Sequence, residues 1–150
     1  MARVTLELPE HFIFTTELPV YINFINYGGH MGNDAVLTLI HEARVRFLRA
    51  YGYTELDIEG RGIVLSDAVI VYKSEGFPGD TLIVKIALTD FVSYGCDICY
   101  QVTNKATGKE VVRAKTGIVF FNYQARCPTR VPEGFRRRFA DIEDETVREA

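Results

Sequence analysis

One amphipathic segment constrains the fold of this chain more than any other feature. From Asp34 to Tyr51 the apolar residues recur with a helical period, and Arg44 and Arg49 fall outside the stripe that they form. Asn33 is a suitable N-cap, and Gly52 is a plausible end of the helix. The pattern predicts one helix of about five turns with an apolar stripe made of Val36, Leu37, Ile40, Ala43, Phe47 and Leu48.

The rest of the chain has mainly strand character. One segment with alternating apolar residues precedes the helix, and four β-rich segments follow it, separated by turn sequences such as "GFPGD" and "KATGK". Short connections of this kind favour an antiparallel meander. The strands are expected at residues 15–27, 63–75, 80–91, 93–104 and 110–123.

A lone amphipathic helix must bury its stripe against the only sheet that the chain can form. We therefore predict an α+β fold in which a five-stranded antiparallel sheet wraps around one long central helix. The 150 residues show no repeat, linker or shift in composition that would divide them, so we expect a single domain over residues 1–150. Its charged C-terminal tail, residues 132–150, could form a short surface helix.

Charge and cysteine content argue against several classes of function. A net charge of −3 leaves no broad basic surface for nucleic acid, and no apolar run approaches the roughly 20 residues that span a bilayer. "CDIC" has the spacing of a metal or redox motif, but strand alternation places Cys96 and Cys99 on opposite faces, so we expect no metal site. Three cysteines cannot all pair with one another, and the N-terminus lacks the pattern of a secretory signal, which favours the cytoplasm.

Three motifs carry a resemblance to a known family: "GGHMGN" at the strand-to-helix junction, "GFPGD" before a strand, and "GIVFFNYQARCPTRVP" near the end. With the order of the elements, they make residues 12–137 resemble the hotdog-fold acyl-CoA thioesterases of the 4-hydroxybenzoyl-CoA thioesterase type. The resemblance implies hydrolysis of an acyl-CoA or acyl carrier protein thioester, with coenzyme A as part of the substrate and no separate cofactor. It also implies a homodimer or homotetramer in which two sheets join edge to edge through the same strand.

Candidate catalytic residues gather where the helix begins. The family usually carries an aspartate, acting as base or nucleophile, at the position of Asn26, and a backbone N–H that polarises the thioester carbonyl at the position of Asn33. Free N–H groups at a helix N-terminus suit such an oxyanion site, and Gly32 could contribute a second one. A neutral amide takes no proton at neutral pH. We therefore expect His30 to be the base, because histidine titrates near pH 6.5; the alternative is a loop histidine that fixes the turn.

Three further assignments have alternatives. Asn26 could belong to the site or only close the turn into "YGGH". Asp34 is expected mainly as a helix cap, with a supporting role beside His30 as the alternative. Glu42 lies at the edge of the apolar stripe, where it could orient water beside the loop of an opposing subunit or pair with Arg46 four residues on.

Coenzyme A also carries a pyrophosphate and a 3′-phosphate, which require basic residues outside the acyl pocket. Such residues occur near strand ends and in the loop after the last strand. We predict that the phosphates contact Lys73, Lys115, Arg126 and Arg130. For each of them the alternative is an ordinary solvated charge.

Two other functions remain open on the sequence. Hotdog dehydratases pair a loop histidine with a helix glutamate, as His30 and Glu42 could, but the proline- and glycine-rich stretch between those residues is missing here. A non-catalytic acyl-thioester binding protein is the second alternative, because Asn26 replaces the usual aspartate.

Overall fold

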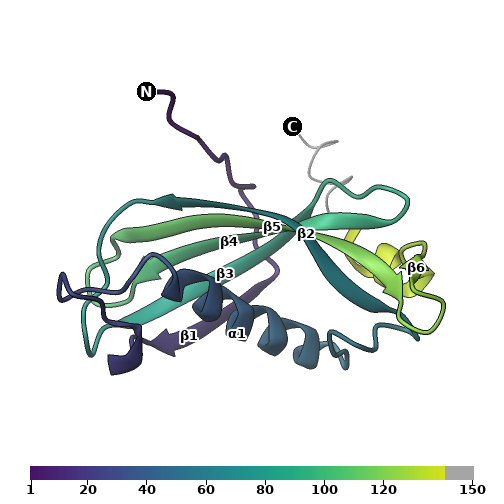
Figure 1. Cartoon of the computed structure of the whole chain (residues 1–150), viewed down its shortest axis with the longest axis horizontal. Helices are drawn as coiled ribbons and strands as arrows, with labels where there is room; N and C mark the ends of the chain where they lie inside the picture. Colours follow the sequence, from purple (N-terminus) through teal and green to yellow (C-terminus); the bar gives the residue numbers. More distant parts are fainter. Residues whose placement is uncertain (141–150) are drawn as a thin grey trace.

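Figure 1 shows the computed structural model of the chain, in which one sheet curves around one long helix. The structure describes residues 1–140. Its elements are β1 (Phe14–Pro19), the 3-10 helix η1 (Ile22–Phe24), α1 (Ala35–Ala50), β2 (Gly62–Tyr72), β3 (Thr81–Thr89), β4 (Gly95–Asn104), β5 (Glu110–Asn122) and β6 (Cys127–Pro128). Residues 133–140 form a further helix.

The strands follow the order β1-β3-β4-β5-β2, and every neighbouring pair is antiparallel. The meander β3-β4-β5 therefore lies in the middle, with β1 and β2 at the edges, and the two-residue β6 adds to β5. The predicted architecture, an α+β hotdog fold with a five-stranded antiparallel sheet around one helix, is confirmed. The four strands after α1 lie close to their predicted ranges.

The segment before α1 differs from the prediction. Alternation predicts a strand over residues 15–27, but β1 ends at Pro19, which pairs with Thr81 at the first position of β3. The Val20 N–H still donates to the Asp80 carbonyl at 2.8 Å, and the backbone then turns away from β3. Phe24 N–H donates to the Tyr21 carbonyl at 3.0 Å, and the chain enters a compact loop that leads to α1.

The apolar stripe of α1 packs against the sheet, but it is rotated relative to the predicted stripe. Leu37 is 45% exposed, whereas Arg44, predicted to lie off the stripe, is only 3% exposed. Arg44 donates to the Tyr100 hydroxyl on β4 at 3.2 Å, so its charge is buried together with polar partners. The buried residues of the helix are Ala35, Val36, Leu39, Ile40, Ala43, Arg44, Phe47 and Leu48.

The predicted stop at Gly52 is confirmed. Gly52 has φ +80°, a left-handed conformation that glycine adopts without strain. Its N–H donates to the Arg49 carbonyl at 3.0 Å, and Tyr53 N–H donates to the Leu48 carbonyl at 2.8 Å. These two bonds satisfy carbonyl groups that the end of a helix would otherwise leave free.

The helix at residues 133–140 is part of the core rather than a surface tail. Phe135 is fully buried and Phe139 nearly so. Phe135 packs against Phe120 of β5 with ring centroids 5.2 Å apart, and Phe139 packs against Phe47 of α1 at 5.5 Å. The prediction of a surface helix is therefore wrong for this segment, and the rest of the predicted tail, residues 141–150, lies outside the described residues.

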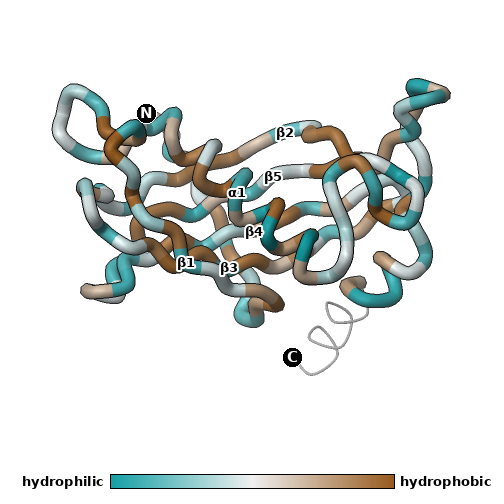
Figure 2. The backbone as a smooth tube through the Cα atoms, turned by 90° about the horizontal axis from the view of Figure 1, so that it is seen from below, coloured by the Kyte–Doolittle hydropathy of each residue, from teal (hydrophilic) through white to brown (hydrophobic). Residues whose placement is uncertain are grey.

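Hydrophobic residues run along α1 and the strands that it crosses, and hydrophilic residues are commoner in the connecting loops (Figure 2). Within residues 1–140, no helix is both long and apolar enough to cross a lipid bilayer. The fold thus places its irregular, polar segments at the two ends of the sheet, and the loop before α1 lies at one of them (Figure 1).

Candidate active site

The loop before α1 is held in shape by its own polar groups. The Asn26 side-chain oxygen, Oδ1, accepts the Gly28 N–H at 2.9 Å. The Asn26 N–H donates to the His30 carbonyl, and the Gly29 N–H donates to the Asn26 carbonyl, both at 3.0 Å. Asn26 therefore closes the turn, as one interpretation of the sequence predicts, while its side-chain NH2 group has no acceptor among the described residues.

Gly28 leaves the space that the His30 ring occupies. A Cβ atom at this position would lie 2.9 Å from His30 Nε2 and 3.3 Å from Asn26 Oδ1. Real Cβ atoms essentially never approach other atoms below 3.0 Å, so the ring would have to move. The first glycine of "GGH" is thus required by close packing, whereas Gly29, at φ +80°, is required by its backbone conformation.

One ring nitrogen of His30 is engaged and the other is directed to the pocket. Nδ1 lies 3.2 Å from the Met31 carbonyl oxygen. A carbonyl only accepts, so this contact assigns the proton of the neutral ring to Nδ1 and leaves Nε2 unprotonated. Nε2 lies 3.6 Å from Glu75 Oε1 in the segment after β2, and the His30 side chain is 31% exposed. His30 therefore presents a basic nitrogen next to a carboxylate.

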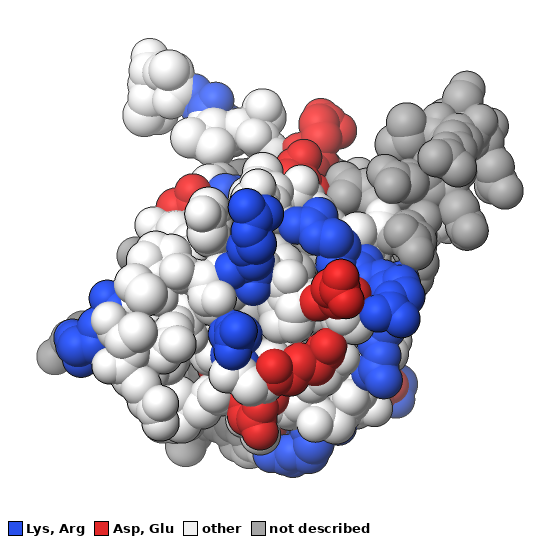
Figure 3. Space-filling model, turned by 90° about the vertical axis from the view of Figure 1, so that its right-hand side faces the viewer, with Lys and Arg blue, Asp and Glu red and all other residues white. Residues whose placement is uncertain are grey.

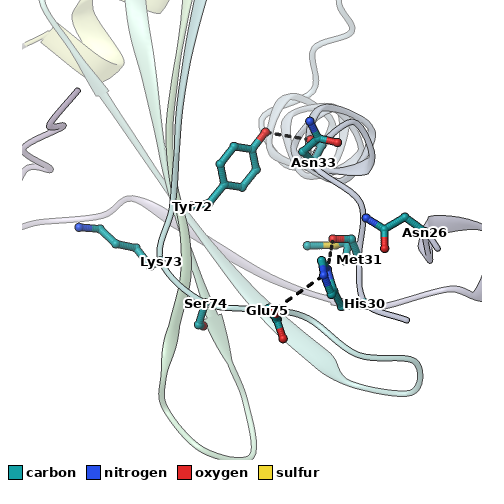
Figure 4. A pocket seen from close by; sticks show the side chains of 8 residues that line it. All are labelled: Asn26, His30, Met31, Asn33, Tyr72, Lys73, Ser74 and Glu75. Atoms are coloured by element: carbon teal, nitrogen blue, oxygen red, sulfur yellow. Dashed lines mark hydrogen bonds and ion pairs between the residues drawn. The ribbon is translucent and has the colours of Figure 1, made fainter. Parts of the chain in front are cut away.

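Two hydrogen bonds bring the end of β2 against this loop. Tyr72 donates its hydroxyl to the Asn33 carbonyl at 3.1 Å, and Met31 N–H donates to the Gly76 carbonyl at 2.6 Å. Between the two segments lies an open pocket of about 430 Å³ (Figure 4). The residues that line it are Asn26, His30, Met31, Asn33, Tyr72, Lys73, Ser74 and Glu75.

The backbone before α1 differs from one N–H group to the next in whether it has an acceptor. The Gly32 N–H donates to the Phe24 carbonyl at 2.8 Å, so the prediction that Gly32 contributes to an oxyanion site is wrong. The N–H of Asn33 has no acceptor within residues 1–140. It lies beside the positive end of a 16-residue helix, where an oxygen that gains negative charge is stabilised.

Of the two residues predicted as possible caps, Asn33 and Asp34, the structure places Asp34 at the start of the helix. Asp34, not Asn33, occupies the N-cap position, and its side chain makes no capping hydrogen bond. The Ala35 N–H instead donates to the Gly32 carbonyl at 3.1 Å. Asp34 is exposed and does not line the pocket that contains His30. A supporting role for Asp34 beside His30 therefore finds no contact in the structure.

Glu42 lies in a different pocket from His30. This pocket lies beside η1, β1 and α1, and its lining includes Phe24, Leu39 and Arg46. The Glu42 carboxylate accepts the Arg46 Nε–H at 2.9 Å, which is the pairing that helical spacing offers as the alternative. Within one chain, the His30 and Glu42 pairing of a dehydratase is thus not formed.

The two candidate lysines lie in different surroundings. Lys73 lines the pocket with His30, and its side chain points away from the imidazole along the surface (Figure 4). Lys115 pairs with Asp67 at 2.9 Å and Asp97 at 3.6 Å on the face opposite α1. Its hydrogen bond lowers the pKa of Asp67, and that bond in turn raises the pKa of Lys115. Lys115 is therefore committed to carboxylates and is not brought to the pocket.

Arg126 and Arg130 lie at the other end of the molecule from His30. The β5–β6 turn, which contains Arg126, follows Phe121, and Phe121 pairs with Gly62 at the beginning of β2. The pocket lies at the opposite end of β2, about 35 Å along an 11-residue strand. Figure 3 looks at this far end, where Lys and Arg side chains gather with a few acidic ones between them. Within one chain these arginines do not reach the pocket.

Glu75 is the residue that sequence reasoning missed. It is the last residue of the predicted strand 63–75 and directly precedes the "GFPGD" motif, so its sequence context is that of a strand end beside a turn. The usable signal is that a carboxylate stands next to a family motif while the expected carboxylate at position 26 is absent. Only the Met31–Gly76 hydrogen bond, between residues far apart in sequence, reveals that it faces His30.

The cysteines show no sign of a metal or redox site in the described residues. Cys96 and Cys99 are buried and Cys127 is exposed, and none of the three forms a disulfide in the described residues. Burial raises the pKa of the Cys99 thiol, which opposes formation of the thiolate that binds metal. Across residues 1–140, no group of three or more His, Cys, Asp and Glu side chains could hold a metal ion.

Solved structures share this fold at low sequence identity. Slr0204, a 1,4-dihydroxy-2-naphthoyl-CoA thioesterase from Synechocystis, aligns with a TM-score of 0.77 and 21% identity over 87% of this chain and 97% of its own. The hypothetical protein SAV2348 from Staphylococcus aureus, solved in complex with CoA, aligns with a TM-score of 0.75 and 18% identity over 91% of this chain and 87% of its own. The 12:0-ACP thioesterase from Umbellularia californica aligns with a TM-score of 0.70 and 16% identity over 82% of this chain and 48% of its own.

At these identities the structural similarity establishes the fold alone. The search of curated proteins finds no match to the sequence. The family model described as "Thioesterase-like superfamily" matches residues 20–139, which include the loop before α1, the segment after β2 and the whole of the sheet beyond β1. The chain therefore belongs to the thioesterase-like superfamily and has its hotdog fold.

Proposed function

We propose that the protein is a thioester hydrolase that cleaves acyl-CoA or acyl carrier protein thioesters in the pocket beside His30. The observation that carries this proposal is the position of His30 Nε2 in the same pocket as Asn33, whose N–H is free at the helix N-terminus. Thioester hydrolysis needs a proton acceptor for water and donors for the developing oxyanion. The pocket contains both kinds of group.

The reaction follows from these groups. His30 Nε2 takes one proton from water, and the water oxygen bonds to the carbonyl carbon of the thioester while the C=O electron pair moves to oxygen. The Asn33 N–H and the free NH2 group of Asn26 donate to this oxyanion. When the carbon–sulfur bond breaks, the departing sulfur takes the proton from the imidazolium. The products are a carboxylic acid and a free thiol.

A dimer through β2 is part of this proposal. β2 is an edge strand that pairs only with β5 in the described part of the chain, and residues 65–68 on it are exposed. Leu65 is 47% and Tyr72 54% exposed, which makes β2 a long, largely apolar edge of the kind that native proteins cover. The same strand of a second copy would pair with it about a two-fold axis, which requires an antiparallel arrangement.

This dimer accounts for the two distant arginines. Antiparallel pairing places the Gly62 end of the partner's β2 beside the Tyr72 end of this chain. Arg126 and Arg130, which lie beyond that end, would then approach the pocket of the opposite subunit next to Lys73. The pyrophosphate and 3′-phosphate of coenzyme A would then meet basic side chains from both subunits, which their negative charge requires. The complex of SAV2348 with CoA supports a CoA carrier, and the plant ACP thioesterase keeps acyl carrier protein as an alternative.

The direct test is release of free thiol from a panel of aliphatic and aromatic acyl-CoA substrates, followed with a thiol-trapping dye. Wild type should turn over at least one of them, and His30→Gln should lower kcat/KM by about 10²-fold or more. Tight binding of an acyl-CoA without turnover would instead support a non-catalytic binding protein.

Two substitutions separate the turn from the chemistry at position 26. Asn26→Asp keeps an oxygen that accepts the Gly28 N–H, so the loop should fold. It exchanges the oxyanion donor for a carboxylate that can take a proton from water, so activity should persist or rise. Asn26→Ala removes both the turn acceptor and the oxyanion donor, and it should lower kcat by about tenfold or more. Normal turnover by Asn26→Ala would show that Asn26 serves only the turn.

A further inference from the structure

The loop before α1 lacks the carboxylate that the family resemblance places at position 26. Asn26 cannot take a proton, and its Oδ1 is already engaged by the Gly28 N–H. Asp34, the acidic residue of this loop, does not line the pocket. The pocket nevertheless contains one carboxylate, and it comes from a different part of the chain.

We infer that Glu75 is the catalytic carboxylate of this protein and acts on the attacking water together with His30. This inference rests on the proposed function. Glu75 lines the same pocket as Asn26, Asn33 and His30, and its Oε1 lies 3.6 Å from His30 Nε2. Figure 4 shows the imidazole and this carboxylate facing each other across the mouth of the pocket.

The distance between the two groups matters for the chemistry. At 3.6 Å, the nitrogen and the oxygen are too far apart for a direct hydrogen bond. A single water molecule can therefore donate one hydrogen to Nε2 and the other to the carboxylate. The Glu75 side chain is 59% exposed, so water reaches it freely.

The segment that carries Glu75 is fixed on both sides of this residue. Ser74 donates its hydroxyl to the Glu110 carbonyl at 2.7 Å, and the Gly76 carbonyl accepts the Met31 N–H at 2.6 Å. A Cβ at Gly76 would lie 3.5 Å from the Met31 side chain, so the two segments are in van der Waals contact. The backbone at position 75 thus keeps a constant position relative to His30.

Other carboxylates near the helix are already committed. The Glu42 carboxylate is paired with Arg46 at 2.9 Å in another pocket. Asp80, at the far end of the segment after β2, accepts the Phe77 N–H at 2.9 Å. In the residues described, the carboxylate that lies in contact with His30 Nε2 is that of Glu75.

The step is balanced as follows. Water loses one proton to His30 Nε2, and its oxygen forms a bond to the thioester carbonyl carbon. Glu75 stays ionised throughout, because it accepts a hydrogen bond from the water and then stabilises the imidazolium by its opposite charge. The imidazolium returns its proton to the departing sulfur. Glu75 therefore contributes charge and orientation and consumes no proton of its own.

The experiment compares wild type, Glu75→Gln and the double variant Asn26→Asp/Glu75→Gln on an acyl-CoA that wild type hydrolyses. Glu75→Gln keeps the size of the side chain and removes its charge, so kcat should fall about 10²-fold while KM changes less than about threefold. Adding Asn26→Asp supplies a carboxylate from the loop and should raise kcat of Glu75→Gln by about tenfold or more. Glu42→Gln, which removes a carboxylate paired elsewhere, should retain kcat within about twofold.

The outcomes separate this inference from the proposed function. If His30→Gln is inactive but Glu75→Gln keeps kcat within threefold of wild type, Glu75 is not the carboxylate and the hydrolase proposal survives. If kcat falls in Glu42→Gln but not in Glu75→Gln, the catalytic carboxylate is Glu42 on α1 and not Glu75. If wild type releases no thiol from any substrate, the proposed function fails, and the inference fails with it. Circular dichroism of each variant shows whether a loss reflects unfolding.

Discussion

Two histidine–glutamate pairs in this molecule differ in what surrounds them. His41 Nε2 on α1 lies 2.6 Å from Glu55 Oε1, whereas His30 Nε2 lies 3.6 Å from Glu75 Oε1. The second oxygen of Glu55 lies 3.5 Å from Arg44 Nε, so that carboxylate already serves a buried cation. Glu75 has no such partner within residues 1–140. The shorter pair is part of the framework, and the longer pair leaves its atoms free for a third molecule.

The network behind the shorter pair explains its structural character. Arg44 is 3% exposed and donates to the Tyr100 hydroxyl, which lies 2.9 Å from the Thr116 hydroxyl on β5. Burial raises the pKa of Tyr100, so its phenol remains protonated and able to donate. A buried cation is tolerated only when it is paired and hydrogen-bonded. Glu55, at the partly exposed edge of the network, supplies the negative charge that pairs with Arg44.

The largest difference between the two pairs is expected in catalysis. His30→Gln should lower kcat/KM by about 10² to 10³-fold, while His41→Gln, the matched substitution on α1, should stay within about twofold of wild type. Thiol release under identical conditions measures both. Equal losses in the two variants would mean that the distinction between a catalytic and a structural pair is wrong.

Stability should show the opposite order. Removing one partner of a buried ion pair costs about 3 to 5 kcal/mol, and because Glu55 is 28% exposed we expect about 1 to 2 kcal/mol of lost unfolding free energy for Glu55→Gln. Glu75→Gln, with an exposed carboxylate, should change that free energy by less than about 0.5 kcal/mol. Urea unfolding gives both values. A larger loss for Glu75→Gln would make Glu75 a structural residue.

A smaller perturbation moves His30 without removing it. In Gly28→Ala, the new Cβ would lie 2.9 Å from His30 Nε2, so the ring must shift away from the pocket. We expect kcat to fall about tenfold, because a misplaced base loses catalytic efficiency. The matched variant Gly52→Ala, with φ +80° after the C-terminal end of α1, introduces backbone strain at the opposite end of the helix and should keep kcat. Unchanged kcat in Gly28→Ala would show that the position of the ring is not critical.

The smallest effect is expected at a third ion pair, Asp67–Lys115, on the outer face of the sheet. The hydrogen bond from Lys115 lowers the pKa of Asp67, so this carboxylate stabilises the fold above its unfolded pKa of about 3.8 and loses that effect as pH falls through its lower folded pKa. The raised pKa of Lys115 preserves the pair up to and beyond about 10.5. Because Asp67 is 58% exposed, the contribution is a few tenths of a kcal/mol.

Asp67→Asn should therefore be slightly less stable than wild type at pH 7, and this deficit should be smaller at pH 2. Urea unfolding at the two pH values measures the difference. A deficit of the same size at both pH values would show that the side chain acts through packing or through its hydrogen bond to the Gly117 N–H rather than through its charge.

Local periodicity was sufficient to predict most of the fold. The stripe of α1, the stop at Gly52 and the four strands after the helix follow from the spacing of apolar residues and from turn chemistry, which are local properties. The burial of Arg44 could not be predicted in this way. Its partner Tyr100 is 56 residues away, so only the folded chain shows that the charge is compensated.

The candidate site was predictable only in part, for the same reason. Asn26, His30 and Asn33 are close in sequence, and the structure places them in one pocket. Glu75 depends on a contact between two loops, and the positions of Arg126 and Arg130 depend on the register of β2 with β5. Proximity created by strand register leaves no mark in the local sequence, so a residue near a strand end can belong to either end of the molecule.

The most direct test of the proposed active site is to determine by NMR which of the two histidine–glutamate pairs lies beside bound acyl-CoA. The chain has three histidines, His11, His30 and His41, so their ring signals can be assigned by substitution and followed by NMR. A non-hydrolysable thioether analogue of acyl-CoA should shift the His30 signals in proportion to its occupancy and leave those of His41 and His11 unchanged. Shifts at His41 with none at His30 would place the site elsewhere and contradict the account.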